Sequence, residues 1–347
     1  MRYRWKILCV SLIAIGFLPS APAQQYEDAE AAYVAGDYET ALRLVTPLAE
    51  SGDRMAQCNL GIMYFHGEGV SQDYRKAFGW FQKAADQGYA PAQLFLGQMH
   101  AQGLGVRKDY EEAANWFLRA AELGYADAQS QLGDLCRKGL GVPQDYEQAN
   151  RWYRAAAEQG DVEAQFNLGV SYIKGSGVAQ DAAEAATWFR KSAEQGFVEA
   201  QCQLGQMYHS GTGVQQDDSE AARWFALAAQ QDHAESQYWL GLLHYFGDGV
   251  PQDFTEAANW FRIAAMQGYA AAQLNLGIAH YKGEGVPLSL VEAYRWYSLA
   301  ATYADKEGDS ALRDRALSYR AATARKMTES EIAEAKRLVR AWRPDTE

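Results

Sequence analysis

The residues most capable of covalent chemistry in this 347-residue chain form a serine–lysine pair. Ser171-Tyr172-Ile173-Lys174 matches S-x-x-K, the pattern in which penicillin-reactive enzymes place their nucleophilic serine. The S-D-N and K-T-G segments that complete such sites are absent from the sequence, as are G-x-S-x-G and the phosphate-binding Walker A pattern. We therefore interpret the four-residue match as chance and predict no catalytic residue and no cofactor.

Histidine and cysteine, frequent ligands of transition metals, are few and scattered in the sequence. The spacing of the histidines matches no metal motif such as H-E-x-x-H. They are His66, His100, His209, His233, His244 and His280. Three cysteines, Cys58, Cys136 and Cys202, follow the N-terminal segment, and an odd number cannot pair completely. We predict buried free thiols and no metal site.

A repeat of 36 residues must position any functional side chain in this protein. Its tryptophans recur without insertion or deletion at Trp80, Trp116, Trp152, Trp188, Trp224, Trp260 and Trp296. The same register carries seven G-x-G-V segments, from Gly67-Glu68-Gly69-Val70 to Gly283-Glu284-Gly285-Val286. Such a period indicates stacked supersecondary units. It also leaves no long loop on which an active site could be built.

The first full repeat, residues 53–88, predicts two helices. Apolar and small residues from Ala56 to Tyr64 follow helical spacing and predict the first helix. Gly67 supplies the left-handed conformation that commonly ends a helix. Asp73 stands at the N-cap of the second helix, which ends at Gly88.

The N-cap position of the second helix carries a capping residue in every repeat. These residues are Asp73, Asp109, Asp145, Asp181, Asp217, Asp253 and Ser289. In six of the seven copies a Glu or Gln follows three residues later, which predicts a capping box. We interpret these acids as structural and not as general acids or bases.

Two invariant columns of the first helix predict close helix packing. Glycine in mid-helix costs about 1 kcal/mol relative to alanine, so Gly61 and its counterparts indicate a neighbour that leaves no room for a methyl group. Gln57 and its counterparts predict a buried amide that bridges helix ends. The glutamine column is Gln57, Gln93, Gln129, Gln165, Gln201, Gln237 and Gln273.

The repeat resembles the Sel-one-like repeat, the short-loop relative of the tetratricopeptide repeat. The shared pattern is A-x-x-L-G-x-x-Y-x-x-G-x-G-V-x-x-D-x-x-x-A-x-x-W-[FY]-x-x-A-A-x-x-G, and it covers residues 53–304 in seven copies. The resemblance implies an all-α protein, a right-handed superhelical α-solenoid of antiparallel helix pairs that serves as an adaptor surface. The tyrosine of the first helix is replaced at His100, Cys136, His244 and His280. For these histidines we predict half-buried rings.

The two ends of the chain depart from the repeat. Basic residues, an apolar run from Ile7 to Leu18 and Ala21-Pro22-Ala23 predict a signal peptide cleaved after residue 23. Residues 24–52 resemble a tetratricopeptide-like helix pair that caps the first repeat. Residues 305–347 predict C-terminal capping helices, with a capping box at Thr328-Glu329-Ser330-Glu331. We expect an exported protein, periplasmic or secreted, with no membrane-spanning segment.

The charge of the chain bears on the kind of partner. The formal net charge is -12, and loss of Arg2, Arg4 and Lys6 with the signal peptide changes it to -15. An acidic solenoid repels nucleic acid and anionic lipid, which bind clustered Lys and Arg. We expect a protein or peptide partner, and the acidic charge favours one with a basic surface. Solubility alone also explains the excess charge.

The partner is expected on the concave face, which the first helices line in solenoids of helical hairpins. Positions at i, i+3 and i+7 share one helical face and vary from repeat to repeat, unlike the core columns. Trp239, Leu242 and Phe246 form an apolar stripe, and we predict a binding surface with Trp239 and Phe246 as its anchors. The alternative for Trp239 is that it fills a local packing gap. The three lysines of the set either contact a carboxylate of the partner or are simply solvated. The complete set is Asn59, Phe95, Gln131, Lys138, Asn167, Lys174, Gln203, Trp239, Leu242, Phe246, Asn275 and Lys282.

These features favour a non-enzymatic repeat scaffold, an adaptor or regulator in an envelope process. One alternative is a protein that binds or hydrolyses cell-wall or β-lactam compounds. A cysteine-rich branch of the resembled family has affinity for penicillin-type ligands, but the three cysteines here do not match its framework. The other alternative is an exported effector that acts on host proteins.

Overall fold

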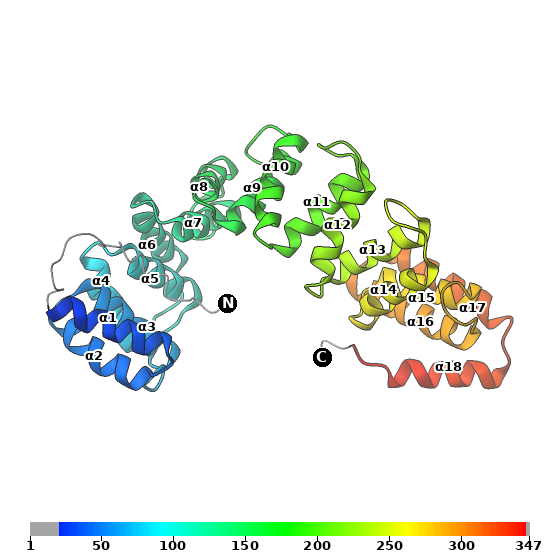
Figure 1. Ribbon diagram of the computed structural model, residues 1–347, viewed down its shortest axis with the longest axis horizontal. Coiled ribbons are helices and arrows are strands. Elements are labelled where there is room, and N and C mark those ends of the chain that lie inside the picture. The colour runs from blue at the N-terminus through cyan, green and yellow to red at the C-terminus, as the bar shows by residue number, and fades with distance from the viewer. Residues whose placement is uncertain (1–20, 345–347) are drawn as a thin grey trace. The chain divides into compact units, whose positions relative to one another are not determined.

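The structure is a computed structural model that describes residues 21–344. All secondary structure in this part of the chain is helical (Figure 1). Of the predicted signal peptide, residues 1–20 lie outside the described residues, and the first helix begins at Ala21. The chain divides into two compact units, Met1–Gln144 and Asp145–Glu347.

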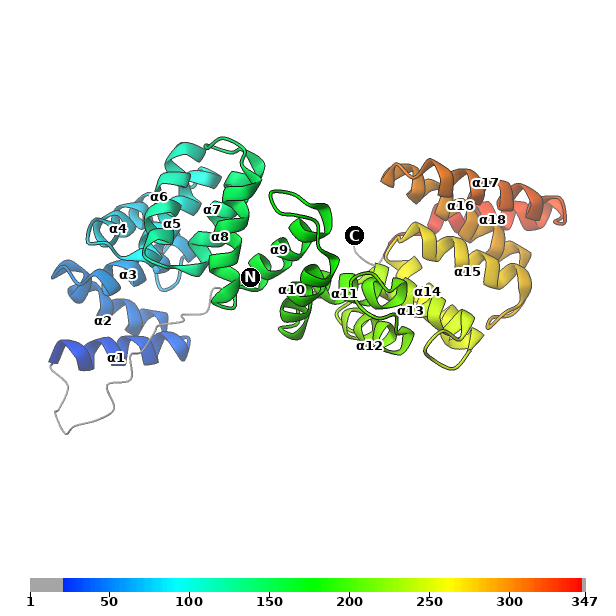
Figure 2. The ribbon, with the colours of Figure 1, turned by 90° about the horizontal axis from the view of Figure 1, so that it is seen from above.

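Within each unit the helices follow one another as short antiparallel pairs that pack on the next pair (Figures 1 and 2). The helices of the first unit are α1 (Ala21–Val34), α2 (Tyr38–Glu50), α3 (Arg54–His66), α4 (Tyr74–Asp86), α5 (Ala90–Gln102), α6 (Tyr110–Glu122) and α7 (Ala126–Lys138). The helices of the second unit are α8 (Tyr146–Glu158), α9 (Val162–Lys174), α10 (Ala182–Glu194), α11 (Val198–Ser210), α12 (Asp218–Ala229), α13 (Ala234–Phe246), α14 (Phe254–Met266), α15 (Ala270–Lys282), α16 (Leu290–Glu307), α17 (Ser310–Ala324) and α18 (Glu329–Ala341). The predicted all-α solenoid of helix pairs is confirmed.

The residues predicted at the N-cap positions do cap the second helices. The Asp73 carboxylate accepts hydrogen bonds from the backbone N–H groups of Arg75 and Lys76, both at 3.0 Å. Equivalent caps are made by Asp109, Asp145, Asp181, Asp217, Asp253 and Ser289. Each cap stabilises its helix by about 1 kcal/mol, which explains why the column is so regular.

A capping box also needs a second hydrogen bond, from the N-cap backbone N–H to the Glu or Gln side chain three residues later. That part of the prediction is wrong in the repeats, because the N-cap N–H already donates to a backbone carbonyl of the first helix. In α10 the Asp181 N–H donates to the Tyr172 carbonyl at 3.0 Å. Glu184 instead accepts a hydrogen bond from Trp188 Nε1 at 2.9 Å. The same backbone bond engages Asp109, Asp217, Asp253 and Ser289. The complete box predicted in the C-terminal segment is present at the start of α18.

In the glutamine column, Gln57, Gln165, Gln201 and Gln237 bridge the ends of consecutive second helices, as predicted, whereas Gln93 Oε1 and Gln273 Oε1 are buried without a hydrogen-bond partner among the described residues. Gln201 Nε2 donates to the Ala193 carbonyl at 3.1 Å, and Gln201 Oε1 accepts from Gln231 Nε2 at 2.9 Å. The first of these bonds is repeated by Gln57, Gln93, Gln129, Gln165, Gln237 and Gln273. Each amide therefore satisfies a carbonyl at a helix end that the repeat stack has buried.

The mid-helix glycines leave room for an aromatic ring of the second helix. A Cβ atom on Gly97 would lie 2.5 Å from the ring of Phe117, which is fully buried. The same clash with a ring would arise at Gly61, Gly169, Gly205, Gly241 and Gly277. The predicted close packing is confirmed, and the group that excludes a methyl is the aromatic side chain of the same repeat.

The G-x-G-V loop joins the two helices of each repeat and packs against the preceding helix pair. Gly67 ends α3 with φ +75°, the left-handed conformation predicted for it. Gly69 has φ +71°, and a Cβ atom there would lie 2.5 Å from the carbonyl oxygen of Tyr38 at the start of α2. The second glycine is thus required both by its backbone conformation and by the close approach of the preceding repeat.

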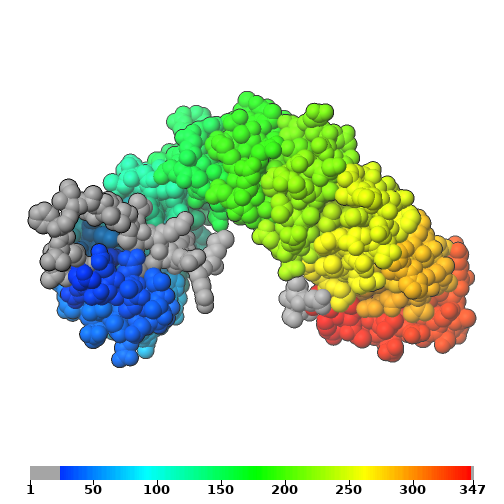
Figure 3. Space-filling model, viewed as in Figure 1, coloured from blue at the N-terminus to red at the C-terminus, as the bar shows by residue number. Residues whose placement is uncertain are grey.

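At the ends of the repeat array, further helices pack on the first and last repeats. In the first unit Gln25 of α1 donates to the Leu44 carbonyl of α2 at 2.9 Å. In the second unit α16 packs against α15, α17 and α18 (Figure 2). Buried Trp342 meets Tyr303 of α16 edge-on, with ring centroids 5.2 Å apart. The space-filling view shows the end of the chain, in red, against the orange and yellow helices that precede it (Figure 3).

None of the helices formed by residues 21–344 is long and apolar enough to cross a lipid bilayer.

Candidate partner-binding groove

The second unit contains a groove of about 590 Å³ between the first helices of its last two repeats and α17. Six aromatic side chains line it: Tyr245, Phe246, Phe261, Tyr281, Tyr297 and Tyr319. Leu242, Asn275, Ile278 and Lys282 complete most of the remaining wall. We call these residues the aromatic groove. Its volume lies within the range of sites that hold a ligand or a peptide side chain.

One rim of the groove carries a small network of polar groups. The Tyr245 hydroxyl donates to Glu284 Oε2 at 2.8 Å and accepts from Lys282 Nζ at 2.9 Å. Lys282 Nζ also lies 3.3 Å from Glu284 Oε2. The hydrogen bond to Tyr245, aided by the Glu284 carboxylate, raises the pKa of the Lys282 ammonium, so this side chain stays charged at neutral pH.

The opposite wall comes from the C-terminal segment and not from a repeat. Tyr319 of α17 packs edge-on against Tyr297 of α16, with ring centroids 5.6 Å apart. Lys326, just after α17, donates to the Tyr281 hydroxyl and lies over that ring, 4.8 Å from its centroid. The helices after the last repeat therefore complete the groove.

Four residues of the predicted binding surface lie together in this groove: Leu242, Phe246, Asn275 and Lys282. The Phe246 side chain is 61% exposed, although its neighbour Tyr245 contacts it edge-on at 5.1 Å. An aromatic side chain left so accessible beside a hollow is typical of a binding surface. Phe246 is thus accessible where the anchor was predicted, and partner binding there stays a prediction.

Two other predicted surface residues lie inside the first unit, which corrects the expectation that their column is exposed. Phe95 is 7% exposed and stacks on Phe81, with centroids 4.6 Å apart and planes 1° from parallel. Asn59 is also 7% exposed, and its Nδ2 donates to the Tyr26 hydroxyl at 2.5 Å. The preceding helix pair covers both side chains, so neither is available to a partner.

Trp239 packs between repeats and does not present an open ring. It stacks on Phe225 of the preceding repeat, with centroids 5.8 Å apart and planes 7° from parallel, and it contacts His209 at 5.5 Å. Its Nε1 atom is buried, and no acceptor among the described residues lies within hydrogen-bonding distance. The packing-gap interpretation therefore fits Trp239 better than the role of an exposed anchor.

The remaining predicted residues are spread along both units. Gln131, Asn167 and Gln203 are half-buried on α7, α9 and α11, respectively. Lys138 and Lys174 are exposed, and Lys138 forms an ion pair of 2.9 Å with Asp134 on its own helix. Partner binding by these five residues stays a prediction.

The groups that suggested covalent chemistry occupy structural positions. Ser171 is 7% exposed, and its hydroxyl donates to the Asn167 carbonyl one turn earlier at 3.0 Å. His100, His244 and His280 are half-buried, as predicted. Burial lowers the pKa of the His280 imidazole, opposed in part by its contact with the Pro287 carbonyl at 3.2 Å. Cys58, Cys136 and Cys202 are buried cysteines that form no disulfide, also as predicted.

Sequence reasoning missed the tyrosines of the groove and one cluster of possible metal ligands. Tyr245 and Tyr281 share one repeat column, one position before Phe246 and Lys282, and its aromatic residues are the signal that could have identified them. Tyr319 lies beyond the repeats, where no column could reveal it. The possible ligands are Cys202, His233 and Glu235, which come from two consecutive repeats.

Comparisons with known proteins agree with this architecture. The Sel1 repeat model matches residues 54–89, 90–125, 126–161, 162–197, 198–233, 234–269 and 270–302. No curated protein sequence matches the chain significantly. Among solved structures, it is similar to a Sel1 repeat protein from Oxalobacter formigenes, with 36% identity and a TM-score of 0.64. That alignment covers 69% of this chain and 98% of the other.

The chain is also similar to c5321, a protective antigen of uropathogenic Escherichia coli strains that displays an SLR fold. The identity is 28% and the TM-score 0.60, over 92% of this chain and 83% of c5321. Proteins built from Sel1 repeats are generally non-catalytic scaffolds for protein–protein interactions. The seven matched repeats and the likeness to both structures show that this chain belongs to the Sel1 repeat family.

Proposed function

We propose that this protein is an exported, non-catalytic scaffold that holds an extended segment of a protein partner in the aromatic groove. The observation that carries the proposal is the exposed Phe246 ring beside a hollow lined by five further aromatic side chains. Truncation of aromatic anchors in interfaces often costs 2 kcal/mol or more. Solenoid repeat proteins bind their partners on such hollowed surfaces.

The chemistry of the groove favours a peptide segment. Its floor is apolar at Leu242, Phe261 and Ile278, which suits a buried apolar side chain. Tyrosine combines a large contact area with a hydroxyl that can pair with peptide groups, and few rotatable bonds become fixed on binding. We therefore propose a segment that inserts an apolar side chain between Phe246 and Tyr319.

Two lysines at the rim of the groove favour a partner segment that also carries a carboxylate. Lys326 donates a hydrogen bond to the hydroxyl of Tyr281, and Lys282 shares Glu284 with Tyr245. Both ammonium groups border the groove, so a carboxylate of the partner beside the inserted side chain would gain charge-assisted hydrogen bonds. The acidic remainder of the chain can contact basic residues elsewhere on the same partner.

The location of the protein is part of the proposal and rests on the sequence of residues 1–23. We place the mature protein in the periplasm, with an adaptor or regulatory role in an envelope process. Cell fractionation against marker proteins of the cytoplasm and periplasm tests this. Recovery of full-length protein with the cytoplasmic marker would contradict export, but it would leave the groove proposal intact.

Site-specific photo-crosslinking tests the groove. A photoreactive amino acid replaces Phe246 in one variant and Leu123 in a matched control, whose side chain is 60% exposed in the first unit. We expect one dominant crosslinked partner from position 246, identified by mass spectrometry with the crosslinked peptide, and no such product from position 123. Equal products from both positions would contradict a localised binding site.

The affinity of that purified partner then tests the anchor. We expect Phe246→Ala to weaken binding at least tenfold, equivalent to about 1.4 kcal/mol, while Leu123→Ala leaves it unchanged. Isothermal titration calorimetry gives both affinities. Binding by Phe246→Ala as strong as that of the unmodified protein would overturn the role assigned to the groove.

A further inference from the structure

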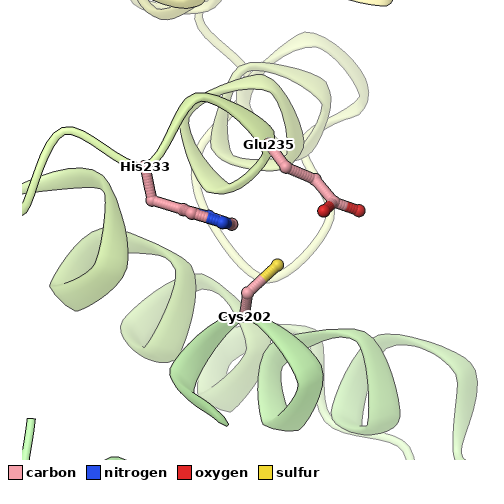
Figure 4. A group of neighbouring side chains, drawn as sticks. All are labelled: Cys202, His233 and Glu235. Carbon is pink, nitrogen blue, oxygen red and sulfur yellow. The ribbon is translucent and has the colours of Figure 1, made fainter. Parts of the chain in front are cut away.

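Three side chains with metal-binding groups converge where α11 meets the start of α13. They are Cys202 of α11, His233 at the N-cap of α13 and Glu235 in its first turn. One ligand atom from each lies within 4.8 Å of the other two, and the three side chains point into the same space (Figure 4). Cys202 is buried, whereas His233 and Glu235 are half-buried, so the cluster is enclosed on one side and open on the other.

Neighbouring polar groups already orient all three side chains. Gln206 Nε2 donates to Glu235 Oε1 at 2.7 Å and lies 3.8 Å from Cys202 Sγ. His233 Nδ1 lies 2.8 Å from the hydroxyl oxygen of Ser236, which is fully buried. Hydrogen bonds of this kind, from groups behind the ligands, fix ligand orientation and tautomer in protein metal sites.

The other repeats provide an internal comparison for this junction. Cys58 occupies the position of Cys202 four repeats earlier, but there Tyr89 stands in place of His233 and Pro91 in place of Glu235. The position of His233 is aromatic at Tyr89, Tyr125, Phe197 and Tyr269. Among the repeats, only the contact between α11 and the start of α13 therefore combines a thiol, an imidazole and a carboxylate at these three positions.

The residue before His233 departs from the repeat as well. Asp232 has φ +62°, the only positive φ of a non-glycine residue among residues 21–344. Glycine holds the equivalent position at Gly88, Gly124, Gly160, Gly196 and Gly268. A non-glycine residue in this conformation is strained, and such strain is concentrated at functional sites. It marks the same junction independently of the ligand cluster.

We propose that Cys202, His233 and Glu235 form a Zn²⁺ site. Thiolate, imidazole and carboxylate are the three ligand types that Zn²⁺ takes from proteins, and a three-ligand site leaves a position for water. When Zn²⁺ binds His233 through Nε2, Nδ1 carries the proton and donates to the Ser236 hydroxyl. This role is independent of the aromatic groove.

Binding replaces the thiol proton of Cys202 by the metal ion and releases that proton to the buffer. Burial raises the pKa of the Cys202 thiol to about 12, with an opposing hydrogen bond from Ser236, so the thiol is protonated before the metal arrives. At the N-cap of α13 the Ser236 N–H donates a hydrogen bond to His233 Nδ1 at 3.3 Å, and this bond is lost when Nδ1 is protonated. Helices α5, α7, α11 and α15 begin without any side-chain cap, so α13 can tolerate this loss.

The test uses the full chain without a polyhistidine tag, reduced and dialysed against Zn²⁺ with a competing chelator. We expect about one equivalent of Zn²⁺ to bind, and Co²⁺ in its place to show a thiolate-to-metal charge-transfer band in the near ultraviolet. Cys202→Ser and His233→Tyr should weaken binding at least about tenfold and remove the band or shift its position. Cys58→Ser is the matched control and should bind like the unmodified protein.

The outcomes separate a metal site from a packing cluster. His233→Tyr introduces the residue that three other repeats carry, at Tyr89, Tyr125 and Tyr269, so it is expected to fold, and circular dichroism with a thermal melt verifies this. Zn²⁺ should raise the melting temperature of the unmodified protein and of Cys58→Ser, but not that of His233→Tyr. Binding of well under one equivalent, or equal losses in Cys58→Ser and Cys202→Ser, would overturn the proposal.

Discussion

Two positions on the same predicted helix face have opposite environments in this protein. Phe95 and Trp239 share a repeat position and stack on Phe81 and Phe225 of the preceding repeat. Phe246 lies seven residues, or about 10.5 Å, further along the same helix as Trp239, and its ring is exposed. In these repeats the preceding repeat therefore covers the N-terminal half of the first helix and leaves its C-terminal end exposed to solvent.

This comparison changes how variable positions in the array should be interpreted. At Phe95 and Trp239 the side chain fills space left by the preceding repeat, so variation of residue type at this position is not by itself evidence that a partner is recognised there. At the Phe246 position the equivalents His66, Lys138, Lys174 and Lys282 are all exposed. Recognition is accordingly expected at the C-terminal ends of the first helices.

Truncation of Phe95 should have the largest effect. We expect Phe95→Ala to lower the free energy of unfolding of the surrounding repeats by about 3–5 kcal/mol, because it removes a buried ring and leaves a cavity against Phe81. Phe246→Ala should change it by less than about 0.5 kcal/mol. Hydrogen exchange of each unit measures the effect locally, since repeat arrays need not unfold in one step. Similar losses in both variants would erase the distinction between the two positions.

Substitution of Trp239 should have an intermediate effect and separate packing from recognition. We expect Trp239→Ala to destabilise the second unit by about 2–3 kcal/mol, less than a fully buried ring, because Trp239 is half-buried. Trp239→Phe keeps an aromatic ring against Phe225 and removes a buried N–H group without an acceptor, so it should be close to neutral. Thermal denaturation with circular dichroism compares the two variants.

Partner binding gives the second measurement for Trp239. If Trp239 acts through packing, Trp239→Phe binds the groove partner with unchanged affinity, while Phe246→Ala does not. A loss of affinity in Trp239→Phe at unchanged stability would return Trp239 to the binding surface.

The sequence was sufficient to predict features that one repeat can specify by itself. The Asp73 cap, the Gln201 bond to a helix-end carbonyl and the space required at Gly97 depend on neighbours at fixed positions in the register, so these features recur along the array. The capping boxes of the repeats were predicted wrongly because a sequence pattern does not show that the Asp181 N–H already pairs with the Tyr172 carbonyl.

The candidate sites were less predictable because they combine residues from different repeats or from outside the array. Tyr319 reaches the groove from α17, where the 36-residue register has ended. Cys202 and His233 are 31 residues apart in the sequence. They indicate a shared site only once α11 is known to pack against the start of α13 in the next repeat. Comparison of columns across repeat junctions, and not only within a repeat, would have identified this pair.

The smallest expected effect concerns the residue before α13, the helix that carries both Trp239 and Phe246. Asp232 adopts φ +62°, which costs a non-glycine residue about 1–3 kcal/mol in general and less for aspartate. Glycine relieves this strain but loses more backbone entropy on folding, so we expect Asp232→Gly to stabilise the second unit by about 0.5 kcal/mol. The reverse change at the equivalent position, Gly196→Asp, should destabilise it by about 1 kcal/mol, and affinity for the groove partner should not change in either variant. Chemical denaturation of both variants measures the difference, and a destabilised Asp232→Gly would mean that the Asp232 carboxylate contributes more to the fold than its backbone strain costs.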